Sequence, residues 1–390
     1  MVLEILEILL YNISIPIKLR SRKRKIREKN MQEIIKVANK FQVEAPIVEV
    51  ERYGCGHIND TYKVTDANGK FYILQKINHK VFKNVEGLMQ NIVGVTEHIY
   101  KTMLSEGEDV SNCLRVIKTT EGAPYYGNEE VGYFRLYNFI YGGISIETSP
   151  TKEQFEVSAI GFGKFQSMLD GYPAETIQDS IPNFHNTVKR FENFEIAVQE
   201  DPENRLCDVM EEVDWFYRRK KYCSQILDLI ECGEIPLRVT HNDTKLNNVL
   251  VDVERNVPVT VIDLDTVMKG SILYDFGDSI RSGTNTGAED EKDLSKVDFS
   301  LELYEAYVKG FLSEVKDKLT ETEKENLSFG AILMTFECGM RFLTDYLDGD
   351  HYFRTHRARQ NLDRCRTQIK MVEKMEEHFE EMDEIVKKYL

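Results

Sequence analysis

The hydrophobic pattern of the chain changes near residue 140. Before that point, short apolar runs rich in β-forming residues alternate with turn residues, which is typical of strands. We expect strands at residues 47–52, 61–64, 70–77, 114–118 and 133–139. A short helix at 33–41 and a long helix at 85–106 interrupt them. The first region therefore predicts a small, β-rich lobe with an antiparallel sheet.

Beyond a Tyr141-Gly142-Gly143 break, which predicts a hinge, apolar positions recur at helical spacing. We expect helices at 151–170, 183–200, 205–231, 296–318, 322–347 and 354–390. The apolar stripe of the last helix is better explained by core packing than by a partner site. The predicted fold class is therefore α+β, with domains at 31–140 and 141–390 and a leader at 1–30.

Length, charge and cysteine content limit the classes of function. A chain of 390 residues is long enough for two lobes, and a net charge of −16 argues against a nucleic-acid partner. The seven cysteines are odd in number and include no Cys-x-x-Cys pair, so we expect neither a disulfide scaffold nor a zinc site. A reducing cytoplasm is the expected location. These features do not fix the oligomeric state.

The first 30 residues pair a broken apolar stretch with a basic run at 18–27. A secretory signal carries its positive charge before the apolar stretch, and a spanning helix is longer and less acidic. The segment is interpreted as an extraneous leader, with the functional start at Met31. The alternative is an amphipathic membrane-surface anchor; we do not expect membrane association.

Residues 240–248 read Thr-His-Asn-Asp-Thr-Lys-Leu-Asn-Asn. Asp243 is followed five residues later by Asn248, and a β-forming run then leads to Asp263. This layout is typical of kinases that phosphorylate a hydroxyl. Asp243 takes or orients the hydroxyl proton, and Asn248 and Asp263 offer oxygen ligands to Mg²⁺. Lys245 places a cation where it can steady the transferring phosphoryl group.

Solvated turns also gather His, Asn, Asp and Lys, but the full set with a β-run before the second aspartate is much rarer. A second aspartate motif, Asp-Phe-Gly at 275–277, lies too far from Asn248 and does not end a β-run. We therefore expect Asp263 to bind the metal and Asp275 to hydrogen-bond backbone groups in the large lobe.

The first lobe offers candidate ATP-binding residues. Gly54 and Gly56 form a glycine-rich turn that lets backbone N–H groups approach phosphates. Lys76 ends a β-run where a phosphate-gripping lysine belongs, and Leu74 on the same strand face can contact adenine.

Phe139 belongs to the run that leads into the hinge and fits an adenine-binding wall or a plain core strand. Glu97 is the favoured helix partner of Lys76, and Glu86 is the alternative. His57, in the glycine-rich loop, can reach over the acceptor.

Together these segments resemble the aminoglycoside phosphotransferase/choline kinase-like superfamily, and most closely its N-acetylhexosamine 1-kinases. The resemblance runs from about Met31 to Arg366. Arg341 and Tyr352, spaced eleven apart, also match. The other matching segments are Gly56-His-Ile-Asn-Asp-Thr61, Ile73-Leu-Gln-Lys-Ile-Asn78, Arg135-Leu-Tyr-Asn-Phe-Ile140, Thr240-His-Asn-Asp-Thr-Lys-Leu-Asn-Asn-Val249 and Val261-Ile-Asp-Leu-Asp-Thr266.

The resemblance implies a bilobal, protein-kinase-like fold and ATP- and Mg²⁺-dependent phosphorylation of the anomeric hydroxyl of N-acetylglucosamine or N-acetylgalactosamine. It further implies that Asp243 is the base and that His57, Arg341 and Tyr352 line the sugar pocket. The basic character of residues 341–366 argues against a cationic acceptor, which favours acidic or aromatic cages. The alternatives are kinases of homoserine, choline, methylthioribose or aminoglycosides, and a non-catalytic pseudokinase.

Overall fold

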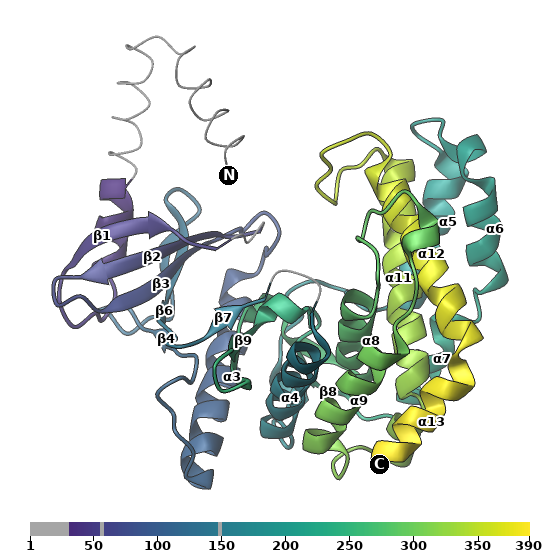
Figure 1. Ribbon diagram of the computed structural model, residues 1–390. Coiled ribbons are helices and arrows are strands. Elements are labelled where there is room, and N and C mark those ends of the chain that lie inside the picture. Colours follow the sequence, from purple (N-terminus) through teal and green to yellow (C-terminus); the bar gives the residue numbers. More distant parts are fainter. Residues whose placement is uncertain (1–30, 55–57, 147–149) are drawn as a thin grey trace, which may run out of the picture. The chain divides into compact units, whose positions relative to one another are not determined.

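The computed structural model describes residues 31–54, 58–146 and 150–390, so the leader lies outside the described residues. The chain forms two compact units (Figure 1). Of the described residues, the first unit comprises those from 31 to 85 and from 115 to 139, and the second comprises those from 86 to 114 and from 140 to 390. Because the first is built on an antiparallel sheet and the second is mostly helical, the predicted α+β class is confirmed.

An antiparallel sheet organises the first unit. Within the described residues its strands are β1 (Ile47–Arg52), β2 (Asp60–Asp66), β3 (Phe71–Ile77), β4 (Val116–Ile117), β5 (Tyr126–Asn128) and β6 (Gly132–Asn138). The hydrogen-bonded order is β1-β2-β3-β6-β4, and β5 also pairs with β6. The five predicted strands are confirmed, whereas β5, only three residues long and containing a glycine, was missed.

The β2–β3 hairpin closes through side-chain chemistry that its sequence predicts. Asp66 Oδ1 accepts hydrogen bonds from the backbone N–H groups of Asn68 and Lys70, each at 2.9 Å. Gly69 adopts φ +83°, a left-handed conformation that glycine takes without steric cost. This turn fixes the register in which Tyr62 faces Leu74 across the two strands.

Apolar side chains on one face of the sheet form the core of the first unit, together with residues of the preceding helical segment. Residues 31–38 are helical, close to the predicted helix at 33–41, and pack against the sheet. The buried core residues are Ala38, Phe41, Ile47, Val50, Val64, Tyr72, Leu74, Phe134 and Leu136. Leu74 therefore has a packing role, and its contact with adenine stays a prediction.

Helices build most of the second unit. They are α3 (Val85–Glu106), α4 (Lys152–Met168), α5 (Thr187–Glu200), α6 (Met210–Arg218), α7 (Tyr222–Glu231), α8 (Ile272–Gly283), α9 (Leu301–Val315), α10 (Glu321–Glu325), α11 (Leu327–Asp348), α12 (Gln360–Glu377) and α13 (Phe379–Tyr389). The long helix α11 is buried along most of its length, since α5, α7, α8, α12 and α13 all pack against it. Within the described part of the chain, no helix combines the length and apolar composition that a membrane crossing needs.

The predicted helices are confirmed with four changes. The helix expected at 322–347 is divided at Asn326 into α10 and α11. The helix expected at 205–231 is divided into α6 and α7, which lets Arg219 and Tyr222 both bind Glu376, at 2.7 and 2.8 Å. The helix expected at 354–390 is divided at His378, whose ψ of 14° leaves the helical range. Helix α8 was missed because its sequence is short and mixes two glycines with polar residues.

Short strands and turns of the second unit shape the segment from 238 to 270. Strand β8 (Arg238–Thr240) pairs with β11 (Met268–Gly270), and β9 (Val249–Asp252) pairs with β7 (Ile144–Ser145) and β10 (Val257–Val261). The short 3₁₀ helices of this unit are Ala174–Thr176, Leu206–Asp208, Leu246–Asn248, Leu264–Thr266 and Leu294–Lys296. Of these strands, the sequence predicted only the run that forms β10.

Residues 86–114, which the sequence analysis grouped with the first lobe, belong to the second unit. Asn91 of α3 shows why: its amide donates to the carbonyl oxygens of Gln178 and Val267, at 2.7 and 3.1 Å.

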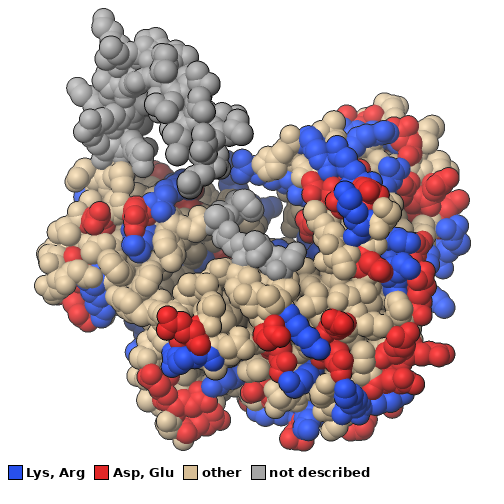
Figure 2. All heavy atoms as spheres, in the orientation of Figure 1, with Lys and Arg blue, Asp and Glu red and all other residues tan. Residues whose placement is uncertain are grey.

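On the face of the molecule shown in Figure 2, acidic and basic side chains are interspersed over the helical unit. The division into a nucleotide-binding and an acceptor-binding domain stays a prediction.

Candidate active site

The segment between β8 and β9 forms a loop whose backbone path depends on Asn242. This residue has φ 62°, a left-handed conformation that Asn tolerates better than most side chains. Its Oδ1 accepts from Thr240 Oγ1 at 3.0 Å, and its Nδ2 donates to the carbonyl of Thr266 at 2.9 Å. The buried Asn242 side chain thus ties the loop to both neighbouring segments, a role that sequence reasoning missed.

The buried carboxylate of Asp275 anchors the same loop through hydrogen bonds to its backbone. Asp275 of α8 accepts from the backbone N–H of His241 at 2.8 Å and of Asn242 at 2.7 Å. Gln166 Nε2 donates a third bond to Asp275 at 2.5 Å. Burial is the main cause that raises the pKa of Asp275, and these donors oppose it. The predicted structural role of Asp275 is confirmed.

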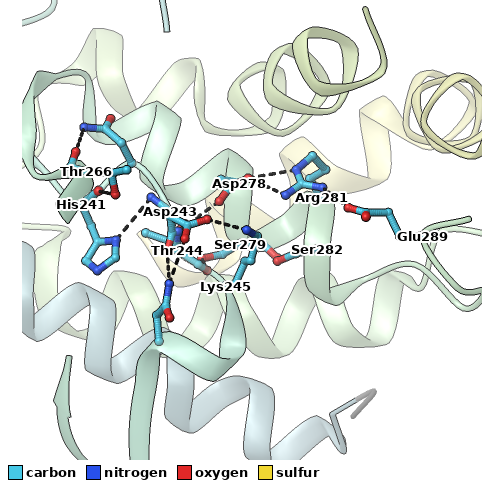
Figure 3. Close-up of polar contacts among 12 residues, drawn as sticks. His241, Asp243, Thr244, Lys245, Thr266, Asp278, Ser279, Arg281, Ser282 and Glu289 are labelled. Carbon is cyan, nitrogen blue, oxygen red and sulfur yellow. Dashed lines mark hydrogen bonds and ion pairs between the residues drawn. The ribbon is translucent and has the colours of Figure 1, made fainter. Parts of the chain in front are cut away.

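Helix α8 also holds Thr244 of the loop, through the side chain of Asp278 (Figure 3). Asp278 accepts from the backbone N–H of Thr244 at 3.0 Å and forms a buried ion pair with Arg281, N–O 2.8 Å. Ser279 Oγ donates to the Thr244 carbonyl at 2.7 Å. The available signal for Asp278 and Arg281 was their spacing of three residues, which places two opposite charges on one helix face.

These anchors present Asp243 between two polar partners. Lys245 Nζ lies 2.7 Å from Asp243 Oδ1, and Asn248 Nδ2 donates to Asp243 Oδ2 at 3.1 Å and to its carbonyl at 2.8 Å. The Asp243 side chain remains 28% exposed, so a substrate can reach it. The structure thus brings three predicted site residues, Asp243, Lys245 and Asn248, into direct contact.

The charges around Asp243 keep it ionised. Burial acts to raise the pKa of Asp243, but the Lys245 ammonium, through its charge and its hydrogen bond, outweighs this, and His241 and Arg281 add to the effect. The net pKa of Asp243 is therefore lower than usual. Reciprocally, the Asp243 carboxylate raises the pKa of Lys245. The pair is an ammonium and a carboxylate at neutral pH.

Asp263 lies on an exposed turn immediately after β10. Its φ of 61° and ψ of 57° are left-handed, which Asp tolerates. The adjacent Ile262 N–H donates to the Asn248 carbonyl at 2.9 Å, and the Ile262 carbonyl lies 2.9 Å from His241 Nε2. The turn that carries Asp263 is thereby tied to both ends of the loop of residues 241–248.

The residues at this turn fit a hard divalent cation. Because Asn248 uses its amide nitrogen toward Asp243, its amide oxygen remains for a cation, and Asp263 supplies a carboxylate. The described residues contain no group of three or more His, Cys, Asp or Glu that can hold a metal. A Mg²⁺ ion here would need further oxygen ligands from water and phosphate, as it commonly does.

A second buried pair, which the sequence did not reveal, supports the loop from α11. Glu337 is fully buried; its two oxygens lie 2.8 Å from His185 Nδ1 and 2.5 Å from Thr187 Oγ1. The other ring nitrogen of His185 lies 3.4 Å from the Asn242 carbonyl oxygen. Although burial opposes ionisation, His185 and the other partners lower the pKa of Glu337. The sequence signal that could have revealed this pair was the acidic Glu337 within the mostly apolar sequence of α11.

A groove between α5 and α11 lies next to this pair, with a volume of about 370 Å³. Arg341 lines it one helical turn after Glu337, and its Nη2 donates to Tyr352 Oη at 3.4 Å. Tyr352 is 61% exposed. The two predicted acceptor residues therefore lie together in one groove, whereas the third, His57, lies outside the described residues.

The predicted nucleotide residues are distributed over both units. Lys76 is on β3, and its Nζ lies 5.7 Å from the centre of the Phe134 ring. Phe139 follows β6 and packs edge-on against Phe71 at 5.5 Å. Gly54, after β1, adopts φ 73°. Gly56 lies outside the described residues.

Glu97 is on α3, in the second unit, whereas Lys76 is in the first. Their pairing, like the alternative with Glu86, stays a prediction.

Comparison with known proteins places this geometry in a family. Residues 49–307 match the family described as "Phosphotransferase enzyme family". Among solved structures, choline kinase from Cryptosporidium parvum is similar with a TM-score of 0.57 and 13% identity, covering 92% of this chain and 99% of that one.

An aminoglycoside phosphotransferase from Alicyclobacillus acidocaldarius has a TM-score of 0.56 and 13% identity, covering 90% of this chain and 96% of that one. Amicoumacin kinase, solved with AMP-PNP and Ca²⁺, has a TM-score of 0.53 and 13% identity, covering 89% and 95%. At these identities the likeness shows the shared kinase-like fold.

Replacing Asp275 with Ala should destabilise the protein by about 3 kcal/mol or more, because buried donors lose their acceptor and each costs ~1–3 kcal/mol. The matched control is Asp263→Asn, since Asp263 is exposed and Asn tolerates the left-handed conformation; its effect should stay within about 0.5 kcal/mol. Urea unfolding followed by circular dichroism measures both. Equal stability of the two variants would remove Asp275 from its anchoring role.

Replacing Lys245 with Met should move the acidic limb of the pH profile of kcat/KM to higher pH. The wild-type ammonium keeps Asp243 ionised at low pH, and its removal leaves burial to raise the pKa of Asp243. Lys269→Met, which removes the same charge from an exposed position on β11, serves as control. Superimposable acidic limbs for wild type and Lys245→Met would show that Lys245 does not set the ionisation of Asp243.

Proposed function

The chain belongs to the phosphotransferase enzyme family, and we propose that it transfers the γ-phosphoryl group of ATP to the anomeric hydroxyl of an N-acetylhexosamine. N-acetylglucosamine and N-acetylgalactosamine are the candidate acceptors, and the sugar 1-phosphate is the product. The odd number of cysteines without a Cys-x-x-Cys pair supports a reducing compartment such as the cytoplasm.

The observation that carries the proposal is the ion pair of Asp243 with Lys245 on a loop whose backbone is anchored to α8. A carboxylate that is exposed on one side and fixed on the other can accept a hydrogen bond from an incoming hydroxyl. The cation beside it can contact the transferring phosphoryl group, whose equatorial oxygens carry negative charge. Positioning and electrostatic stabilisation are the main contributions that a protein makes to this type of reaction.

The low pKa of Asp243 defines how this residue acts. A carboxylate with a lowered pKa is a weak base, so it does not remove the hydroxyl proton before the phosphoryl group arrives. In a loose transition state the attacking oxygen becomes acidic only as its bond to phosphorus forms. Asp243 therefore orients the hydroxyl first and accepts its proton late, which suits the comparatively acidic anomeric hydroxyl.

Asn248 and Asp263 are the residues that would hold Mg²⁺. When bound, this ion neutralises negative charge on the ATP phosphates. The hydrogen bond from Ile262 to the Asn248 carbonyl keeps the two candidate ligands on adjoining backbone segments. Lys76 on β3, with Glu97 or Glu86 as its partner, would contact ATP phosphates from the first unit. Gly54, Gly56, Leu74 and Phe139 complete the proposed ATP-binding set.

The groove that contains Arg341 and Tyr352 supports a sugar acceptor. A neutral sugar is recognised by directional hydrogen bonds, which guanidinium and phenol groups provide. Choline and aminoglycosides are cationic and would meet the Arg341 charge at this end of the groove. Homoserine and methylthioribose remain alternatives within the family, and a pseudokinase is the non-catalytic alternative. His57 is proposed as a further acceptor contact.

An ADP-release screen of the full chain tests the proposed function. N-acetylglucosamine, N-acetylgalactosamine, homoserine, choline, methylthioribose and an aminoglycoside are each supplied with ATP and Mg²⁺. The proposal expects turnover with at least one hexosamine that exceeds turnover with every non-sugar acceptor. Preference for a non-sugar acceptor would replace the hexosamine, and nucleotide binding without any turnover would favour the pseudokinase.

Replacing Asp243 with Asn should lower kcat by roughly 10²–10⁴, the usual contribution of a positioned acid–base group. The affinity for ATP should change little, because the introduced amide keeps the shape of the side chain and only its charge is lost. Single-turnover kinetics together with a nucleotide titration separate the two effects. An unchanged kcat would remove Asp243 from the proton-accepting role.

Replacing Arg341 with Ala or Tyr352 with Phe should raise the KM for the N-acetylhexosamine and leave the KM for ATP within about twofold. Each lost hydrogen bond should cost ~0.5–1.5 kcal/mol. Steady-state kinetics with each substrate varied in turn measure the two constants. An effect on ATP alone would place these residues on the nucleotide side, and no effect would make them ordinary surface residues.

A further inference from the structure

In the groove between α5 and α11, basic side chains lie at one end and acidic side chains at the other. Arg190 of α5 and Arg341 of α11 line one end, and Glu200 and Asp348 line the other. The ten residues from 190 to 200 correspond to about 15 Å along a helix. The arginine end adjoins the catalytic loop, because Arg341 lies one turn after Glu337, which contacts the loop through His185.

Two guanidinium groups share one aromatic residue at this end. Arg190 Nε and Nη2 donate to the Phe184 carbonyl at 3.2 and 3.0 Å, and the Arg341 guanidinium carbon lies 5.4 Å from the centre of the Phe184 ring. Arg341 also lies 5.6 Å from the Tyr352 ring centre. Burial, followed by the positive charge of Arg341, lowers the pKa of Arg190, as expected when like charges lie close together.

Among the described residues, no carboxylate forms a direct ion pair with either arginine. The charge of the buried Glu337 nevertheless acts on both and, against the effect of burial and together with Tyr352, raises the pKa of Arg341. Within the described ranges, neither Arg190 nor Arg341 has a carboxylate oxygen within 4.0 Å. Glu337 uses both oxygens for His185 and Thr187. Asp345, the nearer acidic residue of the groove, accepts from the backbone N–H groups of Tyr352 and Phe353 and from Asn361.

Other partly buried arginines of the second unit contrast with this pair, since each forms an ion pair with Asp or Glu. They are Arg205, Arg219, Arg238, Arg281, Arg357 and Arg364. Two adjacent guanidinium groups that make no direct ion pair keep a net positive charge beside the single Glu337 carboxylate, and an anionic ligand would neutralise it. A planar guanidinium pair matches carboxylate, sulfate and phosphate oxygens in geometry and in charge.

We infer that the Arg190–Arg341 pair binds an acidic group of the acceptor, so that the preferred hydroxyl substrate is a sugar that carries a carboxylate, sulfate or phosphate. The inference rests on the proposed function for the reaction and the sugar class. The acidic group lies at the arginine end, because Glu200 and Asp348 repel an anion at the other end. A neutral or amino-bearing part of the acceptor faces those two carboxylates.

The test compares acceptors in matched neutral and anionic pairs. One pair is N-acetylglucosamine and its 6-sulfate, and the other is glycerol and glycerate, which contains no sugar. ADP release by the full chain with ATP and Mg²⁺ gives kcat/KM for each acceptor. We expect at least a tenfold preference for the anionic member in whichever pair is turned over. Isothermal titration of both sulfated and unsulfated N-acetylglucosamine into the ADP·Mg²⁺ complex gives the same comparison for binding.

Variants then assign the preference to the pair. Arg190→Gln should reduce the anionic-to-neutral ratio at least fivefold, whereas Arg190→Lys, which keeps the charge, should retain most of it. A merely structural loss would lower both acceptors equally and leave the ratio unchanged. Arg218→Gln removes the same charge from an exposed position on α6, outside the groove, and should leave the ratio as in the wild type.

The outcomes separate this inference from the proposed function. Turnover of glycerate but of no hexosamine would reject the sugar and keep the anion site. Turnover of N-acetylglucosamine that equals or exceeds that of its 6-sulfate would keep the sugar and reject the anion site. If no acceptor is turned over, equal affinities of the two hexosamines in the titration, or an Arg190→Gln ratio equal to that of the wild type, would also reject it.

Discussion

The loop of residues 241–248 depends on one buried carboxylate, that of Asp275. It accepts hydrogen bonds from two consecutive backbone N–H groups, those of His241 and Asn242, and so fixes the peptide that leads into Asp243. Consecutive N–H groups point the same way only where the backbone departs from a regular strand, which the left-handed Asn242 achieves. The position of the Asp243 carboxylate is therefore set by α8, although the α8 residue that binds the loop, Asp275, is itself buried.

Much of the fold was predictable because local signals and tertiary packing agree. The hairpin turn at Asp66 carries its own hydrogen bonds, and the apolar spacing of α11 reports the burial that the structure shows. Helix α8 was missed because its stability comes from contacts with α11 and the loop, which a short window cannot contain. The breaks at Arg219 and His378 were missed for the same reason, since helical periodicity continues across them.

The site was predictable where residues lie close in sequence and hidden where they do not. Asp243, Lys245 and Asn248 sit within six residues, so spacing alone placed them together. His185 and Glu337 are 152 residues apart, and only the fold brings them into contact at 2.8 Å. Arg190 of α5 and Arg341 of α11 likewise come from distant segments, and both contact Phe184. The proposed acceptor side of the site contains such distant pairs and is thus the part that was hardest to predict from the sequence.

We propose that the loop of residues 241–248 directs phosphoryl transfer to the hydroxyl at the anomeric carbon of a sugar. The most direct measurement is phosphorus–proton correlation NMR of the product formed from ATP, Mg²⁺ and N-acetylglucosamine or its 6-sulfate by the full chain. We expect a new phosphate resonance correlated with the anomeric proton, and no such resonance with Asp243→Asn over the same time. A phosphate correlated with another ring position, or release of inorganic phosphate with unchanged sugar, would contradict it.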